Sequence, residues 1–143
     1  MADERRAVTR AGIHPLHAFL LAGCAPLFLG ALLSDWAYSS TYEIQWTNFA
    51  SWLLVGALIL AGFALLWALV DLLHADRSWR GRPLIYFFVL LAAWVLGFAN
   101  ALVHAKDAWA KMPEALILSV IVAILVLAAC WLGFSSWRSG EVK

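Results

Sequence analysis

Residues 50–70 read ASWLLVGALILAGFALLWALV, a run of 21 residues without a charged side chain. An α-helix rises about 1.5 Å per residue, so about 20 apolar residues cross the hydrocarbon core of a bilayer, which is roughly 30 Å thick. The run therefore predicts a transmembrane helix.

Three more apolar segments of similar length accompany this run. Extended to their polar flanks, the four expected spans are residues 14–38, 48–74, 83–104 and 114–137. Hydrophobic residues make up 64% and charged residues 13% of the 143 positions, a balance outside the range of soluble globular chains. We expect one all-α domain over residues 1–143, a polytopic membrane protein whose short loops connect neighbouring helices into an antiparallel four-helix transmembrane bundle.

Lys and Arg are unevenly divided between the two sides of the expected bundle. Two of the ten, Lys106 and Lys111, flank one side, and eight flank the side with both termini: Arg5, Arg6, Arg10, Arg77, Arg80, Arg82, Arg138 and Lys143. Positive flanks stay cytoplasmic, so we expect a multi-pass protein of the bacterial inner membrane with both termini in the cytoplasm. Residues 1–12 would be a cytoplasmic tail, too polar for the centre of a signal peptide, and we expect the first helix to be retained. The net charge of +1 gives no indication of nucleic-acid binding.

Ionisable residues within membrane spans are costly in hydrocarbon and usually face the bundle interior. His14 and His17 are three residues apart and share a face of the first span, as Asp71 and His74 do on the second. The rise of a helix puts His17 and Asp71 each about 14 Å to the cytoplasmic side of its span's centre. If the two faces meet, these four residues form an inner polar layer.

Three interpretations of the inner layer stay open. Imidazoles from two helices would ligate a b-type haem, with His17 and His74 as axial ligands, His14 beside them at the helix cap, and Asp71 orienting a ring nitrogen. The same imidazoles and carboxylate suit zinc or iron. Alternatively, the four side chains contact headgroups or water at the interface and only cap or orient the helices.

A second polar layer is expected toward the outer side. Asp35 and His104 lie at similar depths, which predicts a pair that couples the first and third spans, and Asn100 is expected to form a hydrogen bond between helices. The pair is interpreted either as a structural salt bridge or as a group that transfers protons or ligands. Cys24 and Cys130 fall within apolar runs, where a thiol acts as a small hydrophobe.

No catalytic motif indicates an enzyme. The chain has no glycine-rich phosphate loop, no nucleophile beside a histidine and no zinc-protease spacing. We interpret it as a membrane protein that binds haem or another redox-linked ligand and takes part in membrane electron transfer. The alternatives are a small transporter or proton-relay component, and a non-catalytic scaffold subunit of a membrane complex. The expected partners are the lipid bilayer, with a second copy of the chain or a redox protein as further candidates.

Several short motifs also point to a family. They are His14-Pro15-Leu16, SDWAY at 34–38, LVDLL at 69–73, the basic loop with Arg77, Arg80 and Arg82, and CWLG at 130–133. Together they resemble the small bacterial four-helix membrane proteins of domain of unknown function 2231, over nearly the whole chain. Some members are joined to iron–sulfur domains, so the resemblance implies a redox role. The family often has a second histidine four or five residues after the first and another at the start of the third helix, where this chain has His17 and Tyr86 nearby.

Overall fold

The computed structural model describes residues 13–75, 81–106 and 111–138, with side chains up to residue 135. It consists of four α-helices: α1 (Pro15–Thr41), α2 (Ile44–His74), α3 (Gly81–His104) and α4 (Glu114–Arg138). Each helix is long and apolar enough to cross a membrane. The predicted all-α polytopic bundle is confirmed.

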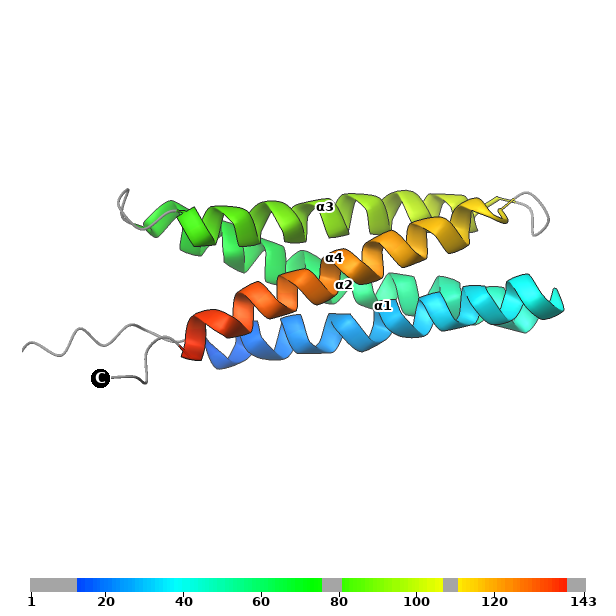
Figure 1. Cartoon of the computed structure of the whole chain (residues 1–143), viewed down its shortest axis with the longest axis horizontal. Coiled ribbons are helices and arrows are strands. Elements are labelled where there is room, and N and C mark those ends of the chain that lie inside the picture. Colours follow the sequence, from blue (N-terminus) through cyan, green and yellow to red (C-terminus); the bar gives the residue numbers. More distant parts are fainter. Residues whose placement is uncertain (1–12, 76–80, 107–110, 139–143) are drawn as a thin grey trace, which may run out of the picture.

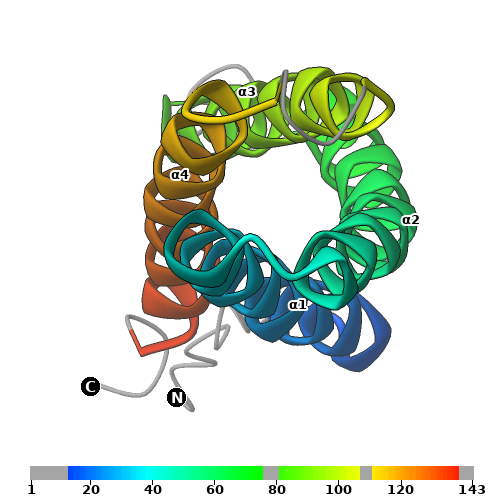
Figure 2. The same ribbon diagram turned by 90° about the vertical axis from the view of Figure 1, so that its right-hand side faces the viewer.

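The helices follow one another around a common axis (Figures 1 and 2). Each packs against its neighbours in sequence, and α4 closes the bundle against α1. The start of α1 and the end of α4 lie at the same end, which we call the terminal end; the α2–α3 connection is also there. The other end, with the α1–α2 and α3–α4 connections, we call the distal end.

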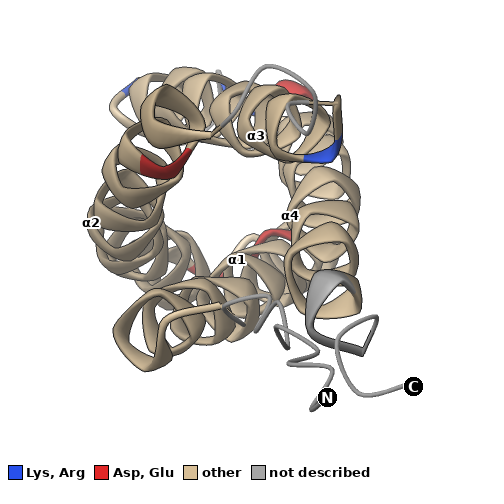
Figure 3. Ribbon diagram, turned by 90° about the vertical axis from the view of Figure 1, so that its left-hand side faces the viewer, with Lys and Arg blue, Asp and Glu red and all other residues tan. Residues whose placement is uncertain are grey.

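On α2, small side chains face the interior and large apolar side chains cover the outside. On α2 the buried residues include Ala57, Ala61 and Ala64, whereas Trp52 is 76% exposed. Figure 3 shows that charged residues are few along the ribbon. An apolar surface of this extent would associate in water, and lipid is the solvent that suits it.

Gly97 marks a close approach between helices. A Cβ atom there would lie 3.1 Å from Phe28 Cε1 on α1 and 3.2 Å from Leu58 Cδ2 on α2. Because Gly97 has no side chain, the ring of Phe28 has room inside the bundle.

The expected spans 14–38 and 48–74 leave residues 39–47 as an outer loop, and this was wrong for most of its length. Helix α1 continues to Thr41 and α2 begins at Ile44. The hydroxyls of Ser40 and Thr41 donate to carbonyl oxygens four residues earlier, at 3.0 and 2.9 Å, so these polar residues extend the helix instead of ending it. Tyr42, with a left-handed φ of 55°, ends α1.

Candidate functional site

A buried polar network, which we call the distal network, lies near the distal end and consists of Asp35, Asn100, His104 and Ser119. Asp35 on α1 is completely buried, and its Oδ1 lies 2.8 Å from Nε2 of His104 on α3. Its second oxygen, Oδ2, accepts a hydrogen bond from the Ser119 hydroxyl on α4. The predicted pairing of Asp35 and His104 is confirmed.

The hydrogen bonds of His104 fix where its protons are. Its Nδ1 lies 3.0 Å from the carbonyl oxygen of Asn100, which can only accept, so Nδ1 carries a hydrogen. The bond between Nε2 and Asp35 Oδ1 needs a second hydrogen. The pair is therefore an imidazolium with a carboxylate or an imidazole with a carboxylic acid, and it has no net charge in either form.

Two further contacts tie the distal end together. Asn100 Nδ2 donates to the Ser119 hydroxyl at 2.7 Å, which confirms the predicted hydrogen bond between helices. Lys111, between α3 and α4, is 4% exposed and donates to the hydroxyl of Thr47 on α2 at 2.6 Å. Burial lowers the pKa of Lys111 below its ordinary value, and the charge of Asp35 partly offsets this shift. These bonds reach all four helices.

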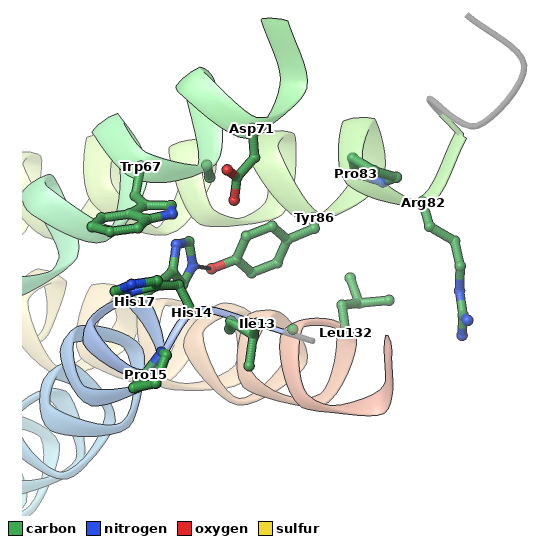
Figure 4. Close-up of a pocket in the computed structure, with 12 residues that line it drawn as sticks. Ile13, His14, Pro15, His17, Trp67, Asp71, Arg82, Pro83, Tyr86 and Leu132 are labelled. Atoms are coloured by element: carbon green, nitrogen blue, oxygen red, sulfur yellow. Dashed lines mark hydrogen bonds between the residues drawn. The ribbon is translucent and has the colours of Figure 1, made fainter. Parts of the chain in front are cut away.

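The terminal end contains a cavity of about 680 Å³, which we call the terminal pocket. All four helices or their ends contribute to its wall (Figure 4). It is lined by Ile13, His14, Pro15, His17, Trp67, Ala68, Asp71, Arg82, Pro83, Tyr86, Leu132 and Gly133. The pocket therefore combines apolar and aromatic walls with a few polar groups, as small-molecule sites do.

His17 is the most buried polar side chain of the terminal pocket, with 2% of its surface exposed. Its Nε2 lies 2.7 Å from the Tyr86 hydroxyl, while its Nδ1 has no hydrogen-bond partner within the described part of the chain. If the hydroxyl donates to Nε2, Nδ1 carries an unpaired hydrogen; if Nε2 donates, Nδ1 is an unpaired acceptor. An unsatisfied buried group costs about 1–3 kcal/mol, so the site would gain from a ligand or water at this nitrogen.

Asp71 and Trp67 form the α2 side of the terminal pocket. Trp67 stacks on the ring of His14 with centroids 4.7 Å apart. Figure 4 shows the Asp71 carboxylate pointing into the space between Trp67 and Tyr86, while the Arg82 side chain extends away from it. Across residues 13–75, 81–106 and 111–135, Asp71 forms neither a hydrogen bond nor a salt bridge.

The structure brings together three of the four residues predicted for the inner layer. His14, His17 and Asp71 line the terminal pocket, but His74 does not, and its Nδ1 lies 2.8 Å from the carbonyl oxygen of Val70 in its own helix. Residues three apart on a helix point about 60° apart, so Asp71 faces inward while His74 turns aside. The predicted convergence of all four was therefore wrong for His74.

A haem with His17 and His74 as axial ligands does not fit this arrangement. Nε2 of His17 is bonded to Tyr86, and His74 lies outside the terminal pocket. Among the described residues, no three His, Cys, Asp or Glu side chains are grouped so that they would hold a metal ion. The described residues therefore do not assemble the ligand set predicted for haem, zinc or iron, and they give electron transfer no support.

Sequence reasoning missed three residues of these two sites. Trp67 lies within an apolar run, where a tryptophan usually serves packing, yet it forms a wall of the terminal pocket beside the two histidines. The signal for Tyr86 was its place near the position where the family often has a histidine. Ser119 is a single hydroxyl in an apolar span, and only its depth, similar to that of Asn100, would have singled it out.

The comparisons with known proteins identify a family. The family model described as predicted membrane protein (DUF2231) matches residues 13–141, and the chain belongs to that family. No curated protein and no solved structure matches.

Proposed function

We propose that this member of the family is a membrane-embedded binding protein that takes a small ligand into the terminal pocket. The observation that carries the proposal is His17, a buried imidazole with an unpaired ring nitrogen on the wall of a cavity of about 680 Å³. A concave pocket of this size, with apolar and aromatic walls and an unsatisfied polar group, favours a binding role.

The core between the two polar ends supports binding rather than passage across the membrane. From the terminal pocket toward the distal network, the buried residues of α1 are Leu21, Cys24, Phe28 and Ala31. Those of α2 between Ala50 and Ala68, which lines the pocket, are Leu54, Ala57, Ala61 and Ala64. Among the buried side chains of these stretches of α1 and α2, a proton or a polar solute would meet only the weak thiol of Cys24 as a hydrogen-bonding group, so a transporter or proton relay is the weaker proposal.

The charge bias of the flanks indicates on which side of the membrane the terminal pocket opens. The side with eight of the ten Lys and Arg residues is the side of the terminal pocket, so we place the pocket toward the cytoplasm in the bacterial inner membrane. All four helices of one chain build the pocket, so the proposal requires neither a homodimer nor a redox partner. A scaffold subunit would need no cavity.

The test fills the pocket without changing its charges. Ala68 is buried and lines the cavity, so Ala68→Phe places an aromatic ring inside it. Leu69→Phe adds a ring on the same helix at an exposed position and serves as the control. Native mass spectrometry of the protein in nanodiscs, after incubation with a small-molecule extract of bacterial cells, should show a bound mass on the wild type and on Leu69→Phe. Ala68→Phe should lose it.

Two results would overturn this function. One is a wild-type protein that retains no small molecule from the extract. The other is a bound mass that Ala68→Phe retains in full, which would place the ligand outside the terminal pocket. The circular dichroism of Ala68→Phe should match that of the wild type, since the substitution leaves the four helices intact.

Haem is tested separately in the same preparation. Haemin added to the wild type should give no absorption spectrum of a haem ligated by two histidines, because His17 and His74 do not face one another across the pocket. A spectrum of that type that disappears in His17→Ala and in His74→Ala would restore the haem hypothesis.

A further inference from the structure

Two charged residues of the described chain line the terminal pocket, Asp71 and Arg82, and Asp71 forms no hydrogen bond or salt bridge with the described residues. Its side chain points between Trp67 and Tyr86, and the guanidinium of Arg82 extends away from it (Figure 4). Asp71 is exposed at the wall of this pocket, and a carboxylate binds most strongly a positive charge that also donates hydrogen bonds. The pocket therefore favours a cation over an anion or a neutral apolar ligand.

The aromatic walls fit the same chemistry. The ring faces of Trp and Tyr attract cations within about 6 Å, and this attraction grows where water is excluded. Trp67 lies on one side of the Asp71 carboxylate and Tyr86 on the other. A planar organic cation would lie against an aromatic face while its charged end reaches Asp71.

His17 supplies a second polar contact, deeper in the pocket. When its Nε2 hydrogen is donated to the Tyr86 oxygen, Nδ1 is an acceptor without a donor. A ligand with more than one N–H group would donate to Asp71 with one, and a second would reach this buried nitrogen by displacing the side chains that cover it. The donors required by Asp71 and His17 are those of an amidinium, a guanidinium or a protonated amine.

We infer that the ligand of the terminal pocket is an organic cation with N–H donors, bound by the Asp71 carboxylate between Trp67 and Tyr86, with His17 as a further acceptor. This inference rests on the proposed function, since it names the chemical class of ligand for the same pocket. It assigns Asp71 the role of selecting charge and the aromatic residues the role of holding the ligand's body.

The test compares two probes of nearly the same shape and different charge. Benzamidine is a planar cation with N–H donors at neutral pH, and benzamide is its neutral counterpart. Isothermal titration calorimetry on the wild-type protein in nanodiscs should show benzamidine binding at least about tenfold more tightly than benzamide, because a charge-assisted hydrogen bond is roughly twice as strong as a neutral one. In Asp71→Asn the two probes should bind equally.

Glu114→Gln is the matched control, because it removes one exposed acidic group at the distal end and should leave the preference for benzamidine unchanged. The comparison of the probes on the wild type needs no variant, so it stands even if Asp71→Asn folds poorly.

Three outcomes overturn the inference: equal binding of both probes to the wild type, no binding of either, or a preference that survives in Asp71→Asn. Equal binding that Ala68→Phe abolishes would leave the proposed function intact and reject only the cation. If the extract gives no bound mass on the wild type, the proposed function itself fails.

Discussion

Each end of the bundle places an aspartate beside a histidine, and the two ends treat the pair differently. At the distal end both oxygens of Asp35 are bonded, to His104 and to Ser119, and the carboxylate is completely buried. At the terminal end Asp71 is exposed and His17 is buried with one ring nitrogen unpaired. The same two residue types therefore form a closed structural network at one end and an open pocket at the other.

The difference follows from what burial requires. A carboxylate sealed within the bundle is tolerated only when hydrogen bonds and an opposite or shared charge compensate for lost hydration. Asp71 keeps contact with solution and needs no such compensation. The distal network connects the helices, whereas the terminal end leaves polar groups unsatisfied. Unsatisfied polar groups lower the stability of the fold, but they are available to bind a ligand.

The largest expected contrast between the ends is the solution that each one faces. Alkaline phosphatase fused after residue 143 should be inactive and a fluorescent protein there should fluoresce, because the charge bias keeps the terminal end in the cytoplasm. Phosphatase inserted at residues 106–111 should be active. Phosphatase activity from the C-terminal fusion would reverse the assignment and turn the terminal pocket toward the periplasm.

Replacing the aspartate at each end should change the free energy of unfolding by different amounts. Asp35→Ala leaves His104 and Ser119 without their acceptor and should lower the free energy of unfolding by about 3–5 kcal/mol, the usual cost of breaking a buried pair. Asp71→Ala breaks no bond of the described chain and should change it by less than about 0.5 kcal/mol. Unfolding in mixed micelles of dodecyl maltoside and dodecyl sulfate, followed by circular dichroism, measures both. Equal losses would show that the terminal end is as tightly coupled as the distal end.

Single hydroxyls give a smaller version of the same contrast. Ser119→Ala removes a donor to Asp35 and the acceptor of Asn100, and it should cost about 1–3 kcal/mol of unfolding free energy. Tyr86→Phe removes one bond to His17 beside a cavity that admits water, so it should cost under about 1 kcal/mol. The same unfolding assay compares them. A larger loss for Tyr86→Phe would contradict an accessible terminal pocket.

The sequence was sufficient to predict the fold and part of each site. Four apolar runs and the charge bias predict the bundle, since span length and hydrocarbon thickness leave little choice. Depth along the helices correctly paired Asp35 with His104 and brought His17 to Asp71. Depth comes from counting residues, and the rise per residue is nearly constant.

Direction around each helix was harder to predict. His74 shares a broad face with Asp71 in a helical projection, but only the packing of α2 against its neighbours decides which of them points inward. The polar run after Tyr38 also suggested a loop, because serine and threonine favour turns in water. In this chain their hydroxyls bond to the helix backbone and extend α1.

The effect confined to the narrowest range of conditions is a pH dependence of stability at the distal end. Lys111 lies outside the spans, and burial lowers its pKa below the ordinary value of 10.5, with the charge of Asp35 partly offsetting the shift. Between that lowered pKa and 10.5 the unfolded chain holds more protons than the folded one, so stability should rise with pH by at most about 1.4 kcal/mol per pH unit and should be flat below the window. Lys111→Met should remove this rise, as measured by the unfolding midpoint across alkaline pH. Lys106→Met, at an exposed lysine of the same connection, should keep it. If wild type and Lys111→Met showed the same slope, the buried ammonium would not contribute to the closed character of the distal end.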